Sequence, residues 1–194
     1  MTRVSDRCRG VAPEGGASHD TRSVRRPIYT NGVLIIQRSE SLAERILRGA
    51  NAFAECVEGL DDAQWSAPVV GDGRPIGVVV HHVASVYPIE VDLAQTLGAG
   101  NPIEGVTWAA IHEMNAQHAS ANAAVSKAEA LELLRSNSAV AASRVREMTD
   151  AELDSAATVS LNGDAPLTAQ FFIEDHALRH SFHHLARIRE TLDA

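Results

Sequence analysis

The sequence has little of what marks several classes of protein. Only two of its 194 residues are cysteine, Cys8 and Cys56, and they are too far apart for a C-x-x-C motif. This excludes a disulfide scaffold and a cysteine-rich zinc module. Aromatic residues make up only 4%, while alanine is abundant, and this favours closely packed helices over a β-sandwich. No apolar run approaches the roughly 20 residues that span a bilayer, so no membrane partner is expected.

Positive charge is also scarce. Seventeen basic residues against 25 acidic ones give a net charge of −8, which argues against general nucleic-acid binding. The hydrophobic content of 45% allows a substantial core. We therefore expect a soluble, cytoplasmic, mostly helical protein that acts on a small molecule. Histidine is the unusual feature of the composition. Eight of the nine histidines lie between His81 and His184.

Residues 1–37 differ in composition from the rest of the chain. They hold several arginines with scattered glycine, proline and serine, and their hydrophobic run, 33–36, is too short for a signal sequence. We predict a disordered N-terminal extension over 1–37 and one folded domain over 38–194.

From residue 38 the spacing of apolar residues becomes helical. Ser41 and Glu44 form an S-x-x-E pattern that predicts a capping box, and so do Ser126 and Glu129. Gly59 is expected to end the first helix. Further helices are predicted over 75–97, 107–124, 126–148 and 168–192, and a short extended segment without a partner strand over 158–161. These elements predict an all-α fold, a four-helix bundle.

The last predicted helix carries a pair of histidines, His180 and His184. Residues four apart lie about 40° apart around a helix, so the two rings share a face. This spacing lets one helix offer two imidazoles to a metal ion. A solvated polar face is the commoner explanation when such a pair stands alone.

A third histidine, His82, falls within the apolar stripe of the helix predicted after Pro75. A buried histidine costs free energy unless its nitrogens are bonded, and a metal ion would occupy one of them. A core histidine bonded to a backbone carbonyl or a carboxylate is the alternative. Combined with the pair on the last helix, His82 predicts a three-imidazole metal site. His81, about 100° away, is the competitor for the first ligand position.

Familiar catalytic motifs are missing. A zincin needs H-E-x-x-H, but residue 181 is serine, and the E-x-x-H motifs of ferritin-like di-iron proteins are absent. The sequence also lacks the G-x-S-x-G of α/β-hydrolases, a P-loop and a dinucleotide fingerprint.

Two stretches resemble the DinB-like proteins, which include mycothiol-dependent maleylpyruvate isomerase domains and related thiol-dependent transferases. They are RPIGVVVHHVA over 74–84 and HSFHHLARI over 180–188, and Trp65 matches a tryptophan often found between the first two helices. The resemblance covers about 38–193. It implies a DinB-like four-helix bundle, a homodimer, and His82, His180 and His184 as the metal ligands.

Arg187 departs from this pattern, because many members of the family have glutamine there. It lies three residues after His184, so it is a candidate substrate contact. A surface salt bridge with Glu190 is the more ordinary explanation.

Three neutral imidazoles leave a divalent ion with open positions, as in catalytic sites. Zinc is expected first, with nickel or iron as alternatives. Such an ion could lower the pKa of bound water toward about 7 for hydrolysis, or bind a low-molecular-weight thiol as the thiolate. The resemblance implies the second option at least as strongly as the first, and we expect a mycothiol-type S-transfer or isomerisation. A metal-dependent hydrolase and a non-catalytic metal- or ligand-binding stress protein are the alternatives. The sequence identifies no general base.

Overall fold

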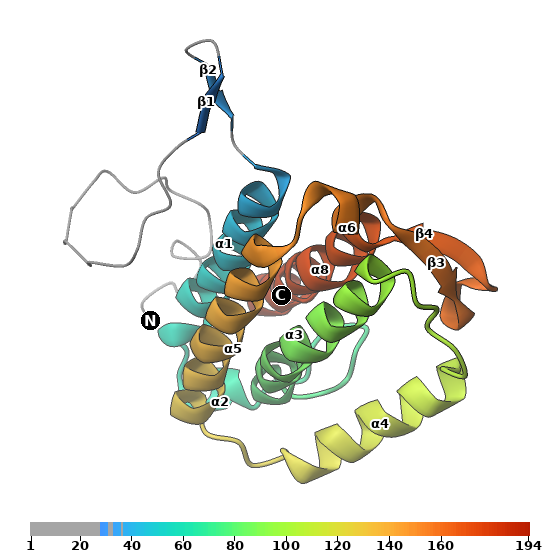
Figure 1. Ribbon diagram of the computed structural model, residues 1–194. Coiled ribbons are helices and arrows are strands. Elements are labelled where there is room, and N and C mark those ends of the chain that lie inside the picture. Colours follow the sequence, from blue (N-terminus) through green and yellow to red (C-terminus); the bar gives the residue numbers. More distant parts are fainter. Residues whose placement is uncertain (1–27, 31–32, 36) are drawn as a thin grey trace.

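Four helical rods form the body of the protein. The structure is a computed structural model that describes residues 28–30, 33–35 and 37–194. Helices α1 (Arg38–Glu58), α3 (Ile76–Gly98) and α5 (Lys127–Glu147) pack side by side with a C-terminal rod that ends in α8 (Arg179–Asp193) (Figure 1). This arrangement confirms the predicted all-α, four-helix bundle.

Helix α1 begins earlier than the predicted capping box indicated. Its N-cap is Gln37, whose side chain makes no capping hydrogen bond, and Ser41 N–H donates to Gln37 C=O within the first turn. The predicted capping box of Ser41 and Glu44 is therefore wrong. Arg38 anchors the additional turn by pairing with Asp150 and Asp154. The helix ends at Gly59, as predicted.

The predicted cap of α5 is present. The Ser126 side chain accepts from Glu129 N–H, and the Glu129 carboxylate accepts from Ser126 N–H, which satisfies two otherwise unpaired donors. Between α1 and α3, the loop contains one short helix, α2 (Asp62–Trp65), and a turn in which Gly71 and Gly73 both have positive φ. This turn matters below because it carries Asp72.

Helix α3 is the central element. Thirteen of its residues are buried, and it packs against α5, the C-terminal rod and several shorter elements. By length and composition α3 could cross a membrane, although the sequence was expected to hold no such segment. However, 61% of its most apolar stretch is buried inside the protein, as in the core helix of a bundle.

Helix α4 (Trp108–Ala121) is packed much more loosely. The Thr107 side chain caps it, but none of its residues is fully buried. Its principal neighbour is α3, and Figure 1 shows it crossing outside the four-rod bundle. It therefore contributes one face to the surroundings of α3 rather than a layer of the core.

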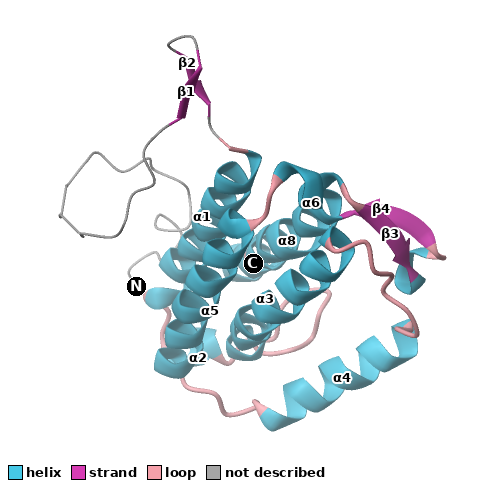
Figure 2. Cartoon of the chain, in the orientation of Figure 1, coloured by secondary structure: helices cyan, strands magenta, loops and turns pink. Residues whose placement is uncertain are grey.

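A small hairpin follows the short helix α6 (Asp150–Asp154). Strand β3 (Ala156–Val159) pairs antiparallel with β4 (Ala165–Thr168), and the 3₁₀ turn η2 (Ser160–Asn162) lies between them (Figure 2). The prediction of an extended segment without a partner is therefore wrong. Val159 is buried, while Gly163 and Asp164 have positive φ and close the hairpin.

The C-terminal rod is not a uniform α-helix. It begins as α7 (Ala169–Ile173), passes through a π-helical turn, η3 (Glu174–Leu178), and continues as α8. Arg179 N–H donates to Glu174 C=O, five residues back, which is the π-helical pattern. Single π turns occur frequently at functional sites.

The N-terminal region is described only in part. Strands β1 (Ile28–Thr30) and β2 (Val33–Ile35) form a short antiparallel pair. The predicted disorder of 1–37 otherwise falls on residues outside those described. Helix α1 begins at Arg38, where the folded domain was predicted to start.

Candidate metal centre

Three histidines converge between α3 and α8. His82, His180 and His184 each offer a ring nitrogen, and these three atoms lie within 4.8 Å of one another. Their ring centroids are 4.7 to 5.6 Å apart. His82 is 5% exposed and His184 is 7% exposed. These are the three residues that the sequence predicted as ligands, and within the described part of the chain no fourth side chain joins the group.

Local helix geometry explains this convergence. His82 lies on α3 between the buried residues Val79 and Val83, so its ring enters the protein interior. His180 and His184 lie one turn apart on α8, directly after the π turn. The two helices pack against each other, and this brings the pair to the single ring.

Glu90 fixes the orientation of His180. The two side chains are 2.9 Å apart, from His180 Nδ1 to Glu90 Oε1, and Glu90 is 9% exposed. When Nδ1–H donates to this carboxylate, the lone pair of His180 is on Nε2. A carboxylate that holds the second nitrogen of a ligating histidine is a recurring feature of metal sites, and it sets the tautomer.

Asp72 takes a related position beside His184. Asp72 Oδ2 is 4.0 Å from His184 Nδ1, which is too long for a direct hydrogen bond, and this nitrogen is buried without a partner. Arg74 binds the same carboxylate, with Nε 2.6 Å from Asp72 Oδ1. The hydrogen bond from Arg74 holds the pKa of Asp72 below its usual range. An anionic group therefore faces His184.

Burial keeps two of the three rings neutral. It lowers the pKa of His82 to about 2 and the pKa of His184 to about 3, and the neighbouring His180 and Arg74 act in the same direction. Metal ions bind neutral imidazole, so these two rings need not lose a proton before binding at neutral pH. Nitrogen donors, buried and deprotonated, fit a divalent transition metal.

His81 is directed elsewhere. Its Nδ1 lies 2.9 Å from His118 Nε2 on α4, and its ring borders a different cavity. Between the two candidates for the first position, the structure brings His82 into the cluster and places His81 outside it.

Arg187 lies beside the turn that carries Asp72. It is half-buried, and a Cβ at Gly71 would come within 3.1 Å of its Nη1 atom. Among the described residues, no ion pair joins it to Glu190. A contact between Arg187 and substrate stays a prediction.

The sequence interpretation missed the residues around the cluster: Glu90, Asp72, Arg74 and His118. Glu90 carried a usable signal, because it follows His82 by two helical turns on the inward face of an apolar helix. Asp72 and Arg74 come from an irregular loop, and His118 from a helix with no clear apolar face, so no periodicity could place them.

Comparison with known proteins identifies a family and a solved structure that are similar to this chain. Residues 45–188 match the family model described as the DinB superfamily. The chain belongs to this superfamily. A solved structure, described as "YfiT from Bacillus subtilis is a probable metal-dependent hydrolase with an unusual four-helix bundle topology", is similar over 88% of this chain and 91% of that one. The TM-score is 0.63 at 17% sequence identity, so the likeness shows a shared fold. No curated protein matches the sequence.

Proposed function

We propose that this DinB superfamily protein is a metal-dependent enzyme that uses a low-molecular-weight thiol, of the mycothiol type, for S-transfer or isomerisation. The observation that carries the proposal is the convergence of His82, His180 and His184 from two helices, with three protein donors in the group. Three-donor sites are typical of catalytic rather than structural metal centres. The similarity of both histidine stretches to thiol-dependent members of the family supports the choice of thiol chemistry.

Each residue around the cluster has a defined part in this proposal. His82, His180 and His184 would hold the ion, with zinc as the first choice. When bound, a divalent cation supplies Lewis acidity, which favours the anionic form of a thiol near neutral pH. Glu90 holds the proton on Nδ1 of His180 and keeps Nε2 available. Burial of His82 and His184 keeps bulk water from their rings.

Metal-dependent hydrolysis is the second candidate, and one observation favours it. The similar structure from Bacillus subtilis is described as a probable metal-dependent hydrolase. The same three histidines would serve either reaction, so the two proposals differ in whether a thiol binds.

Thermal shifts of the zinc-loaded protein with mycothiol, bacillithiol or glutathione test the choice. A thiol that binds only the native state at 100 times its Kd adds about 2.7 kcal/mol to the free energy of unfolding. We expect mycothiol to stabilise the protein and a His184→Ala variant to lose the response. Stabilisation by none of the thiols would reject the transferase proposal. Metal-dependent ester or amide cleavage without thiol would then support the hydrolase. Neither activity, with metal still bound, would support a non-catalytic metal-binding protein.

A further inference from the structure

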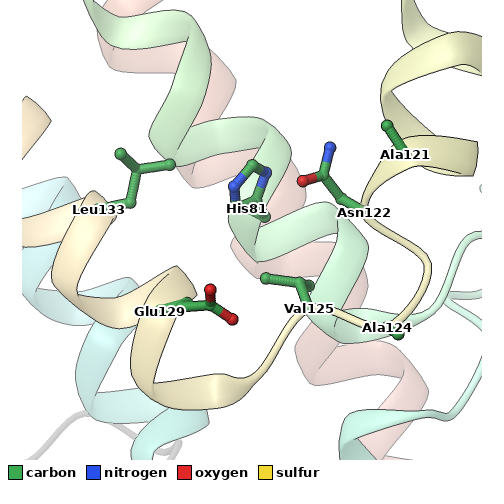
Figure 3. A pocket seen from close by; sticks show the side chains of 7 residues that line it. All are labelled: His81, Ala121, Asn122, Ala124, Val125, Glu129 and Leu133. Carbon is green, nitrogen blue, oxygen red and sulfur yellow. The ribbon is translucent and has the colours of Figure 1, made fainter.

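A second group of polar side chains lies on the neighbouring face of α3, outside the histidine cluster. An open surface pocket of about 420 Å³ is lined by three polar residues, His81, Asn122 and Glu129, and by four apolar ones, Ala121, Ala124, Val125 and Leu133. All seven are half-buried or exposed, and Glu129 is one of the exposed ones. Figure 3 shows side chains from α3, α5, the end of α4 and the segment that follows it around this space. The volume is within the range of cavities that bind small molecules.

The hydrogen bonds around His81 favour one position for the proton of its ring. Ser85 Oγ donates to His82 C=O at 3.0 Å, so its only proton is used there. His118 Nε2 lies 3.3 Å from Ser85 Oγ and 2.9 Å from His81 Nδ1. Ser85 Oγ can then only accept, which makes His118 Nε2–H the donor to both atoms. Because His81 Nδ1 accepts, a neutral His81 carries its proton on Nε2 and keeps one donor.

The other two polar residues present acceptors. Asn122 Nδ2 donates to His118 C=O at 2.8 Å, which leaves Asn122 Oδ1 without a partner among the described residues. The Glu129 carboxylate uses Oε2 for the α5 cap, and Oε1 makes no hydrogen bond within the same part of the chain. Hydrogen bonds from Ser126 also lower the pKa of Glu129, so this acceptor is anionic at neutral pH.

We propose that this cavity binds a small primary amine with a hydroxyl group and an apolar body. The ammonium group would donate to Glu129 and Asn122, and the hydroxyl oxygen would accept from His81 Nε2–H. The apolar body would lie against Val125 and Leu133. The proposal uses no residue of the histidine cluster and is independent of the function proposed for it.

Phenylalaninol is a suitable probe, because it carries an ammonium group, a hydroxyl group and an apolar ring. Its N-acetyl derivative keeps the ring and the hydroxyl but has no charge. We expect saturable binding of phenylalaninol by calorimetry, and binding of the acetylated compound that is weaker by about fivefold or more. Equal affinity for the two compounds, or no saturable binding of phenylalaninol, would overturn the proposal.

Two variants with matched charge changes locate the site. Glu129→Gln keeps a side chain that can still cap α5, so the fold should be retained. It should raise the Kd of phenylalaninol by about five- to tenfold. Glu132→Gln removes an exposed charge from the same helix outside the cavity and should leave the Kd unchanged. An unchanged Kd in Glu129→Gln, or the same loss in both variants, would place the probe elsewhere.

Binding should be equal before and after treatment of the protein with a chelator. Dependence on metal would show that the probe occupies the histidine cluster instead, and would overturn this proposal without touching the first one. Conversely, a protein that binds phenylalaninol but takes up no added zinc would refute the metal centre and leave this site standing.

Discussion

Two adjacent residues of α3, His81 and His82, have different surroundings. His82 faces α8, is 5% exposed and lies among imidazole rings. His81 faces α4, is half-buried and borders a cavity. One residue corresponds to a rotation of about 100° around the helix. The partner helices set the difference: α8 belongs to the tightly packed bundle, while α4 buries none of its residues fully.

The comparison shows that burial, rather than residue type, decides what a histidine can do here. On the α8 side burial lowers the pKa of His82 to about 2, so the ring is neutral near pH 7 and can offer a nitrogen lone pair to a metal ion. On the α4 side burial is incomplete, and the nearby Glu129 carboxylate opposes its lowering effect on the pKa of His81. The predictions below test this division, from the largest expected effect to the smallest.

Removal of a ring from the α8 side should have the largest effect. His82→Ala or His184→Ala should reduce zinc affinity by more than about 100-fold, because the effect of losing a ligand exceeds that of losing an outer partner. Metal content after dialysis measures this loss. His81→Ala is the matched control and should keep full metal content. Full metal content in both cluster variants would mean that the ligands are assigned wrongly.

Loss of the carboxylate behind His180 should have a smaller effect. Glu90→Gln preserves the shape of the side chain but removes the anionic acceptor, and should lower zinc affinity by roughly 10- to 100-fold. Competition with a chromophoric chelator measures the affinity. Glu55→Gln, an exposed change on α1, should leave it unchanged. An equal affinity in Glu90→Gln would remove Glu90 from the site.

The α4 side can be disturbed independently through Gly77, which lies one turn before His81. A Cβ at Gly77 would come within 2.5 Å of the Trp65 indole, whose Nε1–H donates to Val125 C=O at the cavity. Gly77→Ala should therefore reduce the free energy of unfolding by about 1–3 kcal/mol. Urea denaturation measures this loss, and metal stoichiometry should remain that of the wild type. Reduced metal content would show that the two faces are coupled.

The pH dependence of the metal-free protein should reflect the neutral rings. The folded-state pKa values of His82 and His184, about 2 and 3, lie below the ordinary value of 6.5. The unfolded chain therefore binds more protons below pH 6.5, and stability should fall as the pH decreases from there toward 3. The slope contributed by each ring is at most about 1.4 kcal/mol per pH unit.

Urea denaturation between pH 7 and pH 4 measures this slope. His82→Gln should flatten it, whereas His81→Gln should change it less because His81 is less buried. A slope in His82→Gln as steep as that of the wild type would show that His82 is not buried in the neutral form.

The sequence was sufficient for the bundle and for the three rings, because both follow helical periodicity. Apolar spacing placed the long helices, and the positions of His82, His180 and His184 on inward faces follow from the same period. Ser126 and Glu129 marked a true cap, whereas Ser41 and Glu44 did not, since pairing of Arg38 with α6 extends α1 by about one turn. Local cap signals do not contain such distant contacts.

The surroundings of the cluster depend on tertiary structure, and the sequence did not predict them. Asp72 reaches His184 through a loop whose path depends on two glycines with positive φ. His118 reaches His81 only because α4 crosses outside α3. The β4 strand that pairs with β3 was also missed, because its residues, Ala165–Thr168, show no alternating pattern.

The direction in which His180 and His184 point depends on the one additional residue in the π turn at Glu174–Leu178. A π turn holds one more residue than an α turn of the same span, so the rod after it is rotated relative to the rod before it. If one residue of this segment were deleted, the turn could relax to α geometry while α7 kept its seat in the bundle. His180 and His184 would then be rotated away from His82 by about 100°, although all three histidines would still be present in the sequence. Relatives that lack this extra residue should therefore bind no metal through these three positions, even where the histidines are present.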